Sequence, residues 1–209
     1  MITVLIIDDH DIVREGVKQI VSETSDIHVR GEARTAAEAL EKLRAASYDV
    51  VVLDLNLPDR PGLDLLTQIR SMYPRTPVLV LTMHREVSYA TRVFRAGAAG
   101  FVGKDTAREH LPTAIRRVTR GERFIAPALA EHLAFDLMNP GGGKRHEQLS
   151  DREFQVLCMI ASGKAPRQIA AELGVSVKTV GTHRARLLQK MGLKNNAELV
   201  QYAIENRLI

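Results

Sequence analysis

The strongest constraint on the fold is an alternation of two patterns in the first part of the chain. Between Thr3 and about Thr119, short apolar runs rich in β-branched residues alternate with segments whose apolar residues recur at helical spacing. The expected strands cover residues 4–7, 28–33, 50–54, 78–82 and 100–102. The expected helices cover residues 12–24, 36–46, 62–72, 86–96 and 107–119. Because the runs are apolar on both faces, the pattern predicts a doubly wound α/β domain with five parallel strands.

The pattern changes after Phe124. A short helical stretch at 128–138 leads into "NPGGGKRHE", whose proline and three glycines are typical of a linker. From Leu149 onward only helical periods remain. We therefore expect three parts, with an α/β domain at 1–121, a linker with a short helix and a Gly-rich stretch at 122–146, and an all-α domain at 147–209.

Serine caps, a proline and glycines divide the last part into four helices. The expected spans are 150–163, 166–174, 176–191 and 196–205. The expected core consists of Ile169, Ala170, Leu173, Val175, Val180, Leu187, Leu188 and Met191. A short helix, a turn with a glycine and a second helix are typical of a helix-turn-helix, whose second helix enters the major groove of DNA.

The charge distribution agrees with this interpretation. Residues 144–209 carry 11 basic and 6 acidic side chains. No acid lies between Glu172 and Glu198, and the basic residues of that stretch are Lys178, Arg184, Arg186, Lys190 and Lys194. A stretch of one sign is either a solvated face or the footprint of binding to a phosphate backbone.

Polar side chains follow the expected strands of the α/β domain. Asp8 and Asp9 end the first strand, Asp54 ends the third, Thr82 ends the fourth, and Lys104 follows the fifth by two residues. The carboxyl ends of parallel strands meet at one edge of a sheet, so these five side chains should converge. Three carboxylates that lie together repel one another unless a cation joins them, and Mg²⁺ is the economical choice.

This arrangement gives Asp54 a chemical role. A carboxylate can attack phosphorus and carry the group as an acyl phosphate, while Lys104 and the Thr82 hydroxyl hold the phosphoryl oxygens. Each residue also has a structural alternative when taken singly. Asp8 or Asp9 can cap a helix, Thr82 can serve as a β-former, and Lys104 can be solvated. Their joint position at four strand ends favours the functional interpretation.

Cysteine content and hydropathy exclude other classes of protein. Cys158 is the only cysteine, so no internal disulfide can form, and it lies in an apolar segment where a buried structural role is expected. No apolar run reaches 18 residues, and the first residues lack the basic region of a signal peptide. We expect a cytoplasmic protein without a membrane partner.

Residues 1 to about 120 resemble the receiver domain of two-component response regulators. The segments "IIDDHDIVREG" and "LDLNLPDRPGLDLL" are similar to the pattern of the NarL/FixJ branch. The resemblance implies a flavodoxin-like fold in which Asp54 accepts phosphate from a histidine kinase. It also implies a Mg²⁺ site made of the carboxylates of Asp8, Asp9 and Asp54 and the backbone carbonyl of Asn56.

The same resemblance assigns a switch. Thr82 and Lys104 would contact the phosphoryl oxygens, and Phe101 would be the rotating aromatic residue. Two positions depart from the common pattern, since Phe101 stands where many receivers have Tyr and Asp105 stands where many have Pro. Without a hydroxyl, Phe101 cannot report the switch by a hydrogen bond. The "DDH" pattern occurs in this branch, so we assign no catalytic role to His10.

The last part of the chain resembles the LuxR/GerE-type DNA-binding domain. The matching segments are "LSDRE", "IAAELGVSVKTVGTHR" and "LLQKMGL", over about 60 residues. The residues implied to lie at or near phosphates of double-stranded promoter DNA are Lys178, Thr179, His183 and Lys190. The candidates to face base edges are Thr182, Arg184 and Ala185. These assignments hold to within one helical position.

Dimer contacts around Val200 and Ile204 are implied by the same resemblance. Gly181 stands where relatives often carry Lys or Arg, and Gly in a helix costs about 1 kcal/mol relative to Ala. Its role, whether close approach to DNA or none, stays open. Pro166 replaces a small polar residue of the first turn.

Together these features predict a transcriptional response regulator that is not an enzyme. Phosphorylation of Asp54 would promote homodimerisation and DNA binding, with a cognate histidine kinase and promoter DNA as partners and RNA polymerase as a further candidate. Asn56 and His84 would tune the lifetime of the phosphoryl group. A phosphatase of the haloacid dehalogenase type is one alternative, but it needs a second Asp where Asn56 stands. A receiver that serves only as a dimerisation scaffold is the other.

Overall fold

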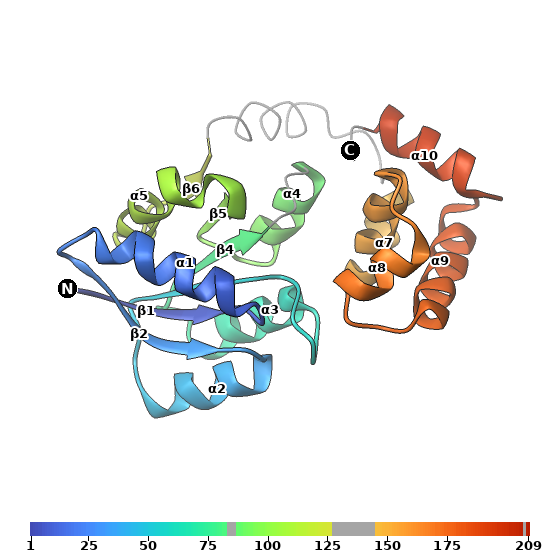
Figure 1. Ribbon diagram of the computed structural model, residues 1–209. Coiled ribbons are helices and arrows are strands. Elements are labelled where there is room, and N and C mark those ends of the chain that lie inside the picture. The colour runs from blue at the N-terminus through green and yellow to red at the C-terminus, as the bar shows by residue number, and fades with distance from the viewer. Residues whose placement is uncertain (83–86, 127–144, 207) are drawn as a thin grey trace. The chain divides into compact units, whose positions relative to one another are not determined.

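The computed structural model describes residues 1–82, 87–126, 145–206 and 208–209 (Figure 1). The chain forms two compact units, an α/β unit followed by a unit of helices. The helix expected at 128–138, most of the glycine-rich linker and His84 lie outside the described residues.

The first unit is built on a parallel sheet, which confirms the expected fold class. Its strands are β1 (Ile2–Ile7), β2 (Ile27–Ala33), β3 (Val50–Leu53), β4 (Val78–Thr82), β5 (Gly100–Gly103) and β6 (Phe124–Ile125). They lie in the order β2-β1-β3-β4-β5-β6, and every neighbouring pair is parallel.

The sixth strand is an addition to the five expected. β6 has two residues and pairs with Gly100 and Phe101 of β5, within the segment that we assigned to the linker. Two residues are too short to show a period, so only the pairing with β5 identifies them as a strand.

Among the described residues, five α-helices cover the sheet. They are α1 (Asp11–Ser22), α2 (Ala36–Ala45), α3 (Gly62–Met72), α4 (Val87–Arg95) and α5 (Ala107–Thr119). Figure 1 shows α1 and α5 on one side of the sheet and α2 and α3 on the other. Every residue of β3 and β4 is buried, as expected for strands covered on both faces. Residues of α1 and α5, such as Val17 and Leu111, join one apolar core with the strands.

The described secondary structure of the second unit consists of helices. They are the 3₁₀ helix η2 (Arg145–Gln148) and the α-helices α7 (Asp151–Ala161), α8 (Pro166–Glu172), α9 (Val177–Met191) and α10 (Asn196–Glu205). This arrangement confirms the expected all-α domain.

The helix ends in this unit follow the sequence signals. Ser150 and Glu153 form a reciprocal capping box at the start of α7, and Ser176 accepts a hydrogen bond from the backbone of Thr179 at the start of α9. Gly192 ends α9 with φ of 63°, a left-handed conformation that favours glycine.

Seven of the eight expected core residues of this unit are buried. Val175 is the exception, because it lies in the turn between α8 and α9 and is partly exposed. Cys158 is buried in α7, as a small apolar residue would be.

Candidate functional site

Two buried carboxylates lie side by side at the carboxyl edge of the sheet. Asp8 follows β1 and Asp54 follows β3, and each is 2% exposed. The backbone N–H of Asp54 donates to the carbonyl of Ile7 at 2.8 Å, and that of Asp8 donates to the carbonyl of Ala33 at 3.0 Å. The sheet ladder therefore continues for one residue beyond the strands and fixes both acids.

Lys104 joins the two carboxylates. It begins the 3₁₀ helix η1 (Lys104–Thr106), directly after β5, and its Nζ lies 2.7 Å from Oδ2 of Asp8 and 2.7 Å from Oδ2 of Asp54. The contact with Asp54 is a hydrogen bond, whereas the contact with Asp8 has only the distance of an ion pair. Burial acts to lower the pKa of Lys104, but the charges of Asp54 and Asp8 outweigh it and raise that pKa above its ordinary value.

For the pKa of Asp54, burial outweighs the attraction of Lys104. Burial raises the pKa of its carboxyl, Lys104 acts against this rise, and the like charge of Asp8 adds to it. The backbone of Asn56 also interacts with this carboxyl and lowers its pKa, but the net direction is upward. The ionised site thus holds more negative charge than Lys104 balances.

The residues present fit a hard divalent cation. One ligand atom from each of Asp8, Asp9, His10 and Asp54 lies within 4.8 Å of the others. Three carboxylates against one lysine leave an excess of two negative charges. Oδ1 of Asp54 is buried and accepts no hydrogen bond from the described residues. Mg²⁺ prefers such carboxylate oxygens and also retains water ligands.

His10 borders the acids from the solvent side. Its Nδ1 lies 2.7 Å from Oδ1 of Asp9 and 3.3 Å from Oδ1 of Asp8, and its side chain is 57% exposed. Its backbone N–H donates to Oδ1 of Asp8 at 2.9 Å. These contacts orient both carboxylates.

Thr82 and Phe101 lie in the adjoining strands. Thr82 is fully buried at the end of β4 and pairs with Gly103, the residue before Lys104. Phe101 pairs with Val80 of β4 and is also buried. The hydroxyl and the aromatic ring expected to form the switch therefore belong to the neighbouring strands β4 and β5.

Sequence reasoning missed two residues that shape the site. A Cβ on Gly62 would lie 2.6 Å from the carbonyl oxygen of Asp54 and 2.5 Å from Cα of Leu55, so only glycine lets α3 begin this close to the end of β3. Arg14 of α1 is buried, and its Nη1 donates to the carbonyl oxygen of Asp8 at 2.7 Å. The only signal for Arg14 in the sequence was its position in the segment "IIDDHDIVREG", which resembles the receiver pattern.

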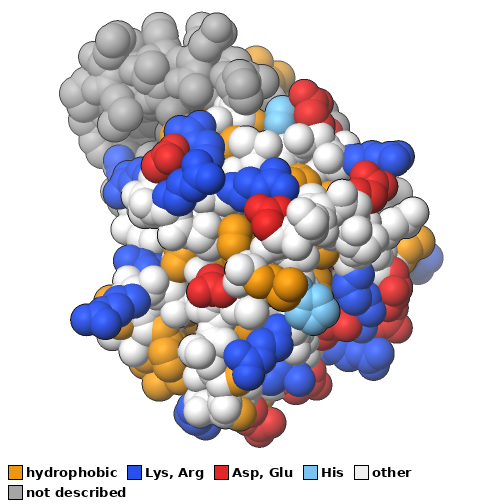
Figure 2. Space-filling view, turned by 90° about the vertical axis from the view of Figure 1, so that its left-hand side faces the viewer, with side chains coloured by type: hydrophobic (Ala, Val, Ile, Leu, Met, Phe, Trp, Pro, Cys, Tyr) orange, Lys and Arg blue, Asp and Glu red, His pale blue; other side chains and the backbone are white. Residues whose placement is uncertain are grey.

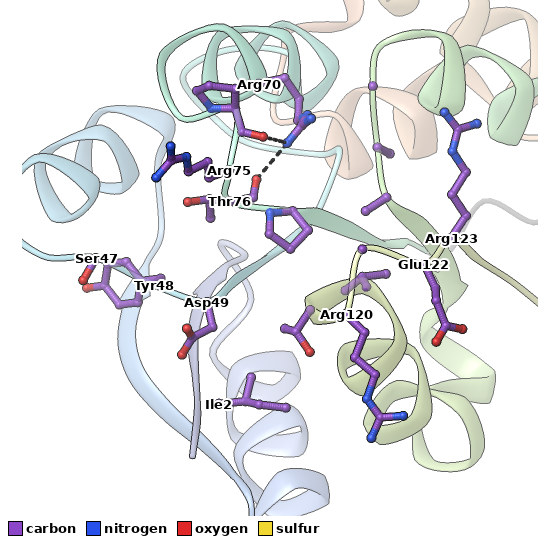
Figure 3. Close-up of a pocket in the computed structure, with 18 of the residues that line it drawn as sticks. Ile2, Ser47, Tyr48, Asp49, Arg70, Arg75, Thr76, Arg120, Glu122 and Arg123 are labelled. Atoms are coloured by element: carbon purple, nitrogen blue, oxygen red, sulfur yellow. Dashed lines mark hydrogen bonds between the residues drawn. The ribbon is translucent and has the colours of Figure 1, made fainter.

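A pocket of about 1050 Å³ lies at the opposite edge of the sheet, near the amino ends of the strands (Figure 3). Figure 3 shows the side chains of Arg75, Arg120 and Arg123 directed away from one another. The two acids in its lining are engaged elsewhere, since Asp49 accepts hydrogen bonds from Thr3 and Glu122 is paired with Arg117. The pocket therefore gathers no group of side chains for chemistry.

The exposed charged side chains on the visible face of Figure 2 are mixed in sign. Figure 2 shows Lys and Arg side chains interspersed with Asp and Glu over the visible face, without a large field of one sign. Asp8 and Asp54, in contrast, are buried together at the carboxyl edge of the sheet.

In the second unit, the expected DNA contacts are spread along α9. Lys178, Thr182 and Ala185 are exposed, whereas Thr179 and His183 are partly buried. Burial and the nearby charge of Arg152 lower the pKa of His183, which favours the neutral form of this imidazole.

Two of the basic side chains expected to contact DNA already have side-chain partners within the unit. Nζ of Lys190 lies 2.7 Å from Oε2 of Glu153, a carboxylate that is nearly fully buried. Nε of Arg184 donates to Oδ1 of Asn196 in α10 at 2.7 Å. Each side chain must share or exchange that partner before it contacts DNA.

The expected dimer contacts lie on α10. Ile204 is 60% exposed, and Val200 is partly buried. Across the described segments, no helix combines the length and apolarity required to cross a membrane.

Comparison with known proteins agrees with this geometry. Residues 4–116 match the response regulator receiver domain, and residues 147–203 match the luxR family of bacterial regulatory proteins. The chain is 34% identical to the response regulator UvrY of Escherichia coli, with 100% of this chain and 96% of UvrY covered. It is 35% identical to the oxygen regulatory protein NreC of Staphylococcus carnosus, with 99% and 98% covered.

A solved structure of RcsB from Salmonella enterica serovar Typhimurium also aligns over most of the chain. That protein is bound to promoter P1flhDC in the presence of the phosphomimetic BeF₃⁻. The TM-score is 0.64 at 27% identity, and the alignment covers 96% of this chain and 97% of RcsB. The chain therefore belongs to the NarL/FixJ family of two-component response regulators, with a receiver domain and a LuxR-type DNA-binding helix-turn-helix domain.

Proposed function

We propose that this response regulator binds promoter DNA under the control of phosphorylation at Asp54, with a histidine kinase as the donor and Mg²⁺ as the cofactor. The observation that carries the proposal is the buried, unpartnered Oδ1 of Asp54 beside Asp8 and Lys104. The proposed domains are 1–121, 122–146 and 147–209, and the family matches at 4–116 and 147–203 support them.

The proposed reaction is a transfer of one phosphoryl group. An oxygen of Asp54 forms a bond to phosphorus as the bond between phosphorus and the histidine nitrogen of the kinase breaks. Asp8, Asp9, Asp54 and the backbone carbonyl of Asn56 would hold the cation. When bound, Mg²⁺ neutralises charge on the transferring oxygens. Lys104, which already lies 2.7 Å from Asp54, is close enough to hold one of those oxygens.

The added charge provides the switch. A phosphoryl group brings about −1.5 to −2 charges and new acceptor oxygens to the edge of the sheet. The Thr82 hydroxyl moves toward these acceptors, and Phe101 repacks into the space that it leaves. This repacking changes the face formed by α4, β5 and α5, and thereby the surface available for dimerisation.

The proposed output is DNA binding by a homodimer through α9. The residues placed at phosphates are Lys178, Thr179, His183 and Lys190, and those placed at base edges are Thr182, Arg184 and Ala185. Val200 and Ile204 would contribute to the dimer, which raises affinity because two half-sites are bound together. The RcsB complex with promoter DNA supports this proposal. RNA polymerase is a further proposed partner, and the cytoplasm is the location that such a regulator requires.

Incubation with a small-molecule phosphodonor and Mg²⁺, followed by mass spectrometry and a mobility-shift assay, tests the proposal. We expect a phosphoryl adduct on the wild-type chain, none on Asp54→Asn, and an unchanged yield on Asp64→Asn, which alters an exposed acid of α3. The phosphodonor should increase dimeric DNA binding by the wild type only. An adduct on the Asp54→Asn variant, or DNA binding that ignores phosphorylation, would contradict the proposal.

A further inference from the structure

A buried arginine contacts the backbone of the acidic cluster. Arg14 of α1 is 5% exposed, and its guanidinium contacts three different groups. Nη1 donates to the carbonyl oxygen of Asp8 at 2.7 Å, Nε donates to Oε2 of Glu32 at 3.1 Å, and Nη2 is paired with Asp11. One side chain thus connects the end of β1, the end of β2 and the start of α1.

The contact with Asp8 leaves its carboxylate available. Arg14 binds the main-chain carbonyl of Asp8, while the side-chain oxygens face Lys104 and His10. The guanidinium therefore orients the residue without competing with a cation for its carboxylate. A buried carbonyl that lost this donor would be left unsatisfied, so the turn after β1 would rearrange.

Each acid that contacts Arg14 is also paired with a second basic side chain. Glu32 is also 3.0 Å from Nζ of Lys18, and Asp11 is 3.1 Å from Nη2 of Arg34. Burial acts to raise the pKa of Glu32, but Lys18 and Arg14 outweigh it and lower that pKa. Both carboxylates are thus held by basic side chains on the side of Arg14, whereas Lys104 contacts Asp8 and Asp54.

We propose that Arg14 is a positioning residue for the cation and phosphoryl site. It holds the turn between β1 and α1 in the conformation in which Asp8 and Asp9 present their carboxylates together. The inference rests on the proposed function, in which this cluster binds Mg²⁺. A planar guanidinium suits the task because it donates in several fixed directions at once, which an ammonium group does not.

Calorimetric titration of the full chain with Mg²⁺, beside thermal unfolding without Mg²⁺, tests this role. We expect Arg14→Gln to weaken Mg²⁺ binding by about tenfold, the usual size of effect for a residue that orients a metal ligand. Glu32→Gln removes the negative charge from one of the three partners of Arg14 and should weaken binding by a smaller factor. At low Mg²⁺, the yield of phosphorylation should be lower for Arg14→Gln than for the wild type, and at saturating Mg²⁺ the two yields should be equal.

Arg116→Gln is the matched control. Arg116 is likewise held by an acid, through two hydrogen bonds of 2.8 Å to Asp26, but it lies in α5 away from the acidic cluster. It should lower the unfolding temperature and leave Mg²⁺ affinity unchanged. If the wild type binds Mg²⁺ and both Arg14→Gln and Glu32→Gln bind it within twofold of the wild type, Arg14 is only structural and the inference fails. If the wild-type chain binds no Mg²⁺, the proposed function itself fails.

Discussion

The acidic site of the receiver domain and the helix α9 of the DNA-binding domain are constructed in different ways. Lys104 and Asp54 are 50 residues apart in sequence, yet their side chains are 2.7 Å apart. The expected DNA contacts, in contrast, all lie within the 15 residues of α9 (Val177–Met191). The first site exists only when three strand ends meet, whereas the second needs one helix packed on one face.

The two regions also differ in the solvent exposure of their charged side chains. Asp8, Asp54 and Lys104 are almost completely removed from solvent, so their mutual interactions are strong. The basic residues of α9 are largely exposed, so salt screens them. A substitution in the acidic site should therefore affect folding and chemistry together, whereas one on α9 should affect mainly binding.

The largest effect should come from Lys104→Met. Removal of the only lysine between Asp8 and Asp54 leaves two buried carboxylates uncompensated, and loss of one partner from a buried pair costs about 3–5 kcal/mol. Urea unfolding at neutral pH measures the loss, and added Mg²⁺ should restore part of it. Lys164→Met breaks the exposed pair with Glu172 and should cost about 0.5 kcal/mol. Equal losses of unfolding free energy in Lys104→Met and Lys164→Met would show that burial does not make the Lys104 pairs stronger than the exposed pair.

The second largest effect should be a change in how stability depends on pH when Asp54 is replaced by Asn. Because the pKa of Asp54 is raised above 3.8 in the folded protein, the native state keeps this proton in a range where the unfolded chain has lost it. Folding is therefore penalised progressively as pH rises above 3.8. Asp54→Asn should remove this penalty, so the variant should exceed the wild type in stability at pH 7 and the two curves should converge in acid. Unfolding free energies at a series of pH values, without Mg²⁺, measure the difference, and parallel curves would refute the assignment.

The smallest effect should come from Gly181→Ala in α9. A Cβ at this position would have nothing within 4 Å, and no packing reason for glycine exists among the described residues. Alanine should therefore stabilise the helix by about 1 kcal/mol, as at other exposed helical positions. Thermal unfolding measures the gain. A loss of stability would mean that this helix needs a glycine for a reason that its packing does not reveal.

Much of the fold could be predicted because its signals are local. Apolar runs marked β1, β3 and β4, and Ser150, Ser176 and Gly192 marked helix ends that the structure has at the same positions. The two-residue strand β6 carried no such signal. Val175 was expected in the core because it is apolar, but it lies in the turn between α8 and α9 and is partly exposed.

The candidate site could be predicted in part for the same reason. A parallel sheet brings its strand ends to one edge, so the meeting of Asp8, Asp54 and Lys104 followed from the order of the elements. The contacts of Arg14 and the close approach at Gly62 could not be predicted, because each depends on backbone that comes near only after folding.

By itself, the sequence determined which residue types stand at which strand end and helix end, because hydropathy and capping act over a few neighbouring residues. Only the tertiary structure decided which of those residues lose contact with water and which partner each charge receives. The attraction between Lys104 and Asp54 is strong because packed strands and helices exclude solvent from it. That exclusion belongs to the folded protein as a whole and to no single segment of it.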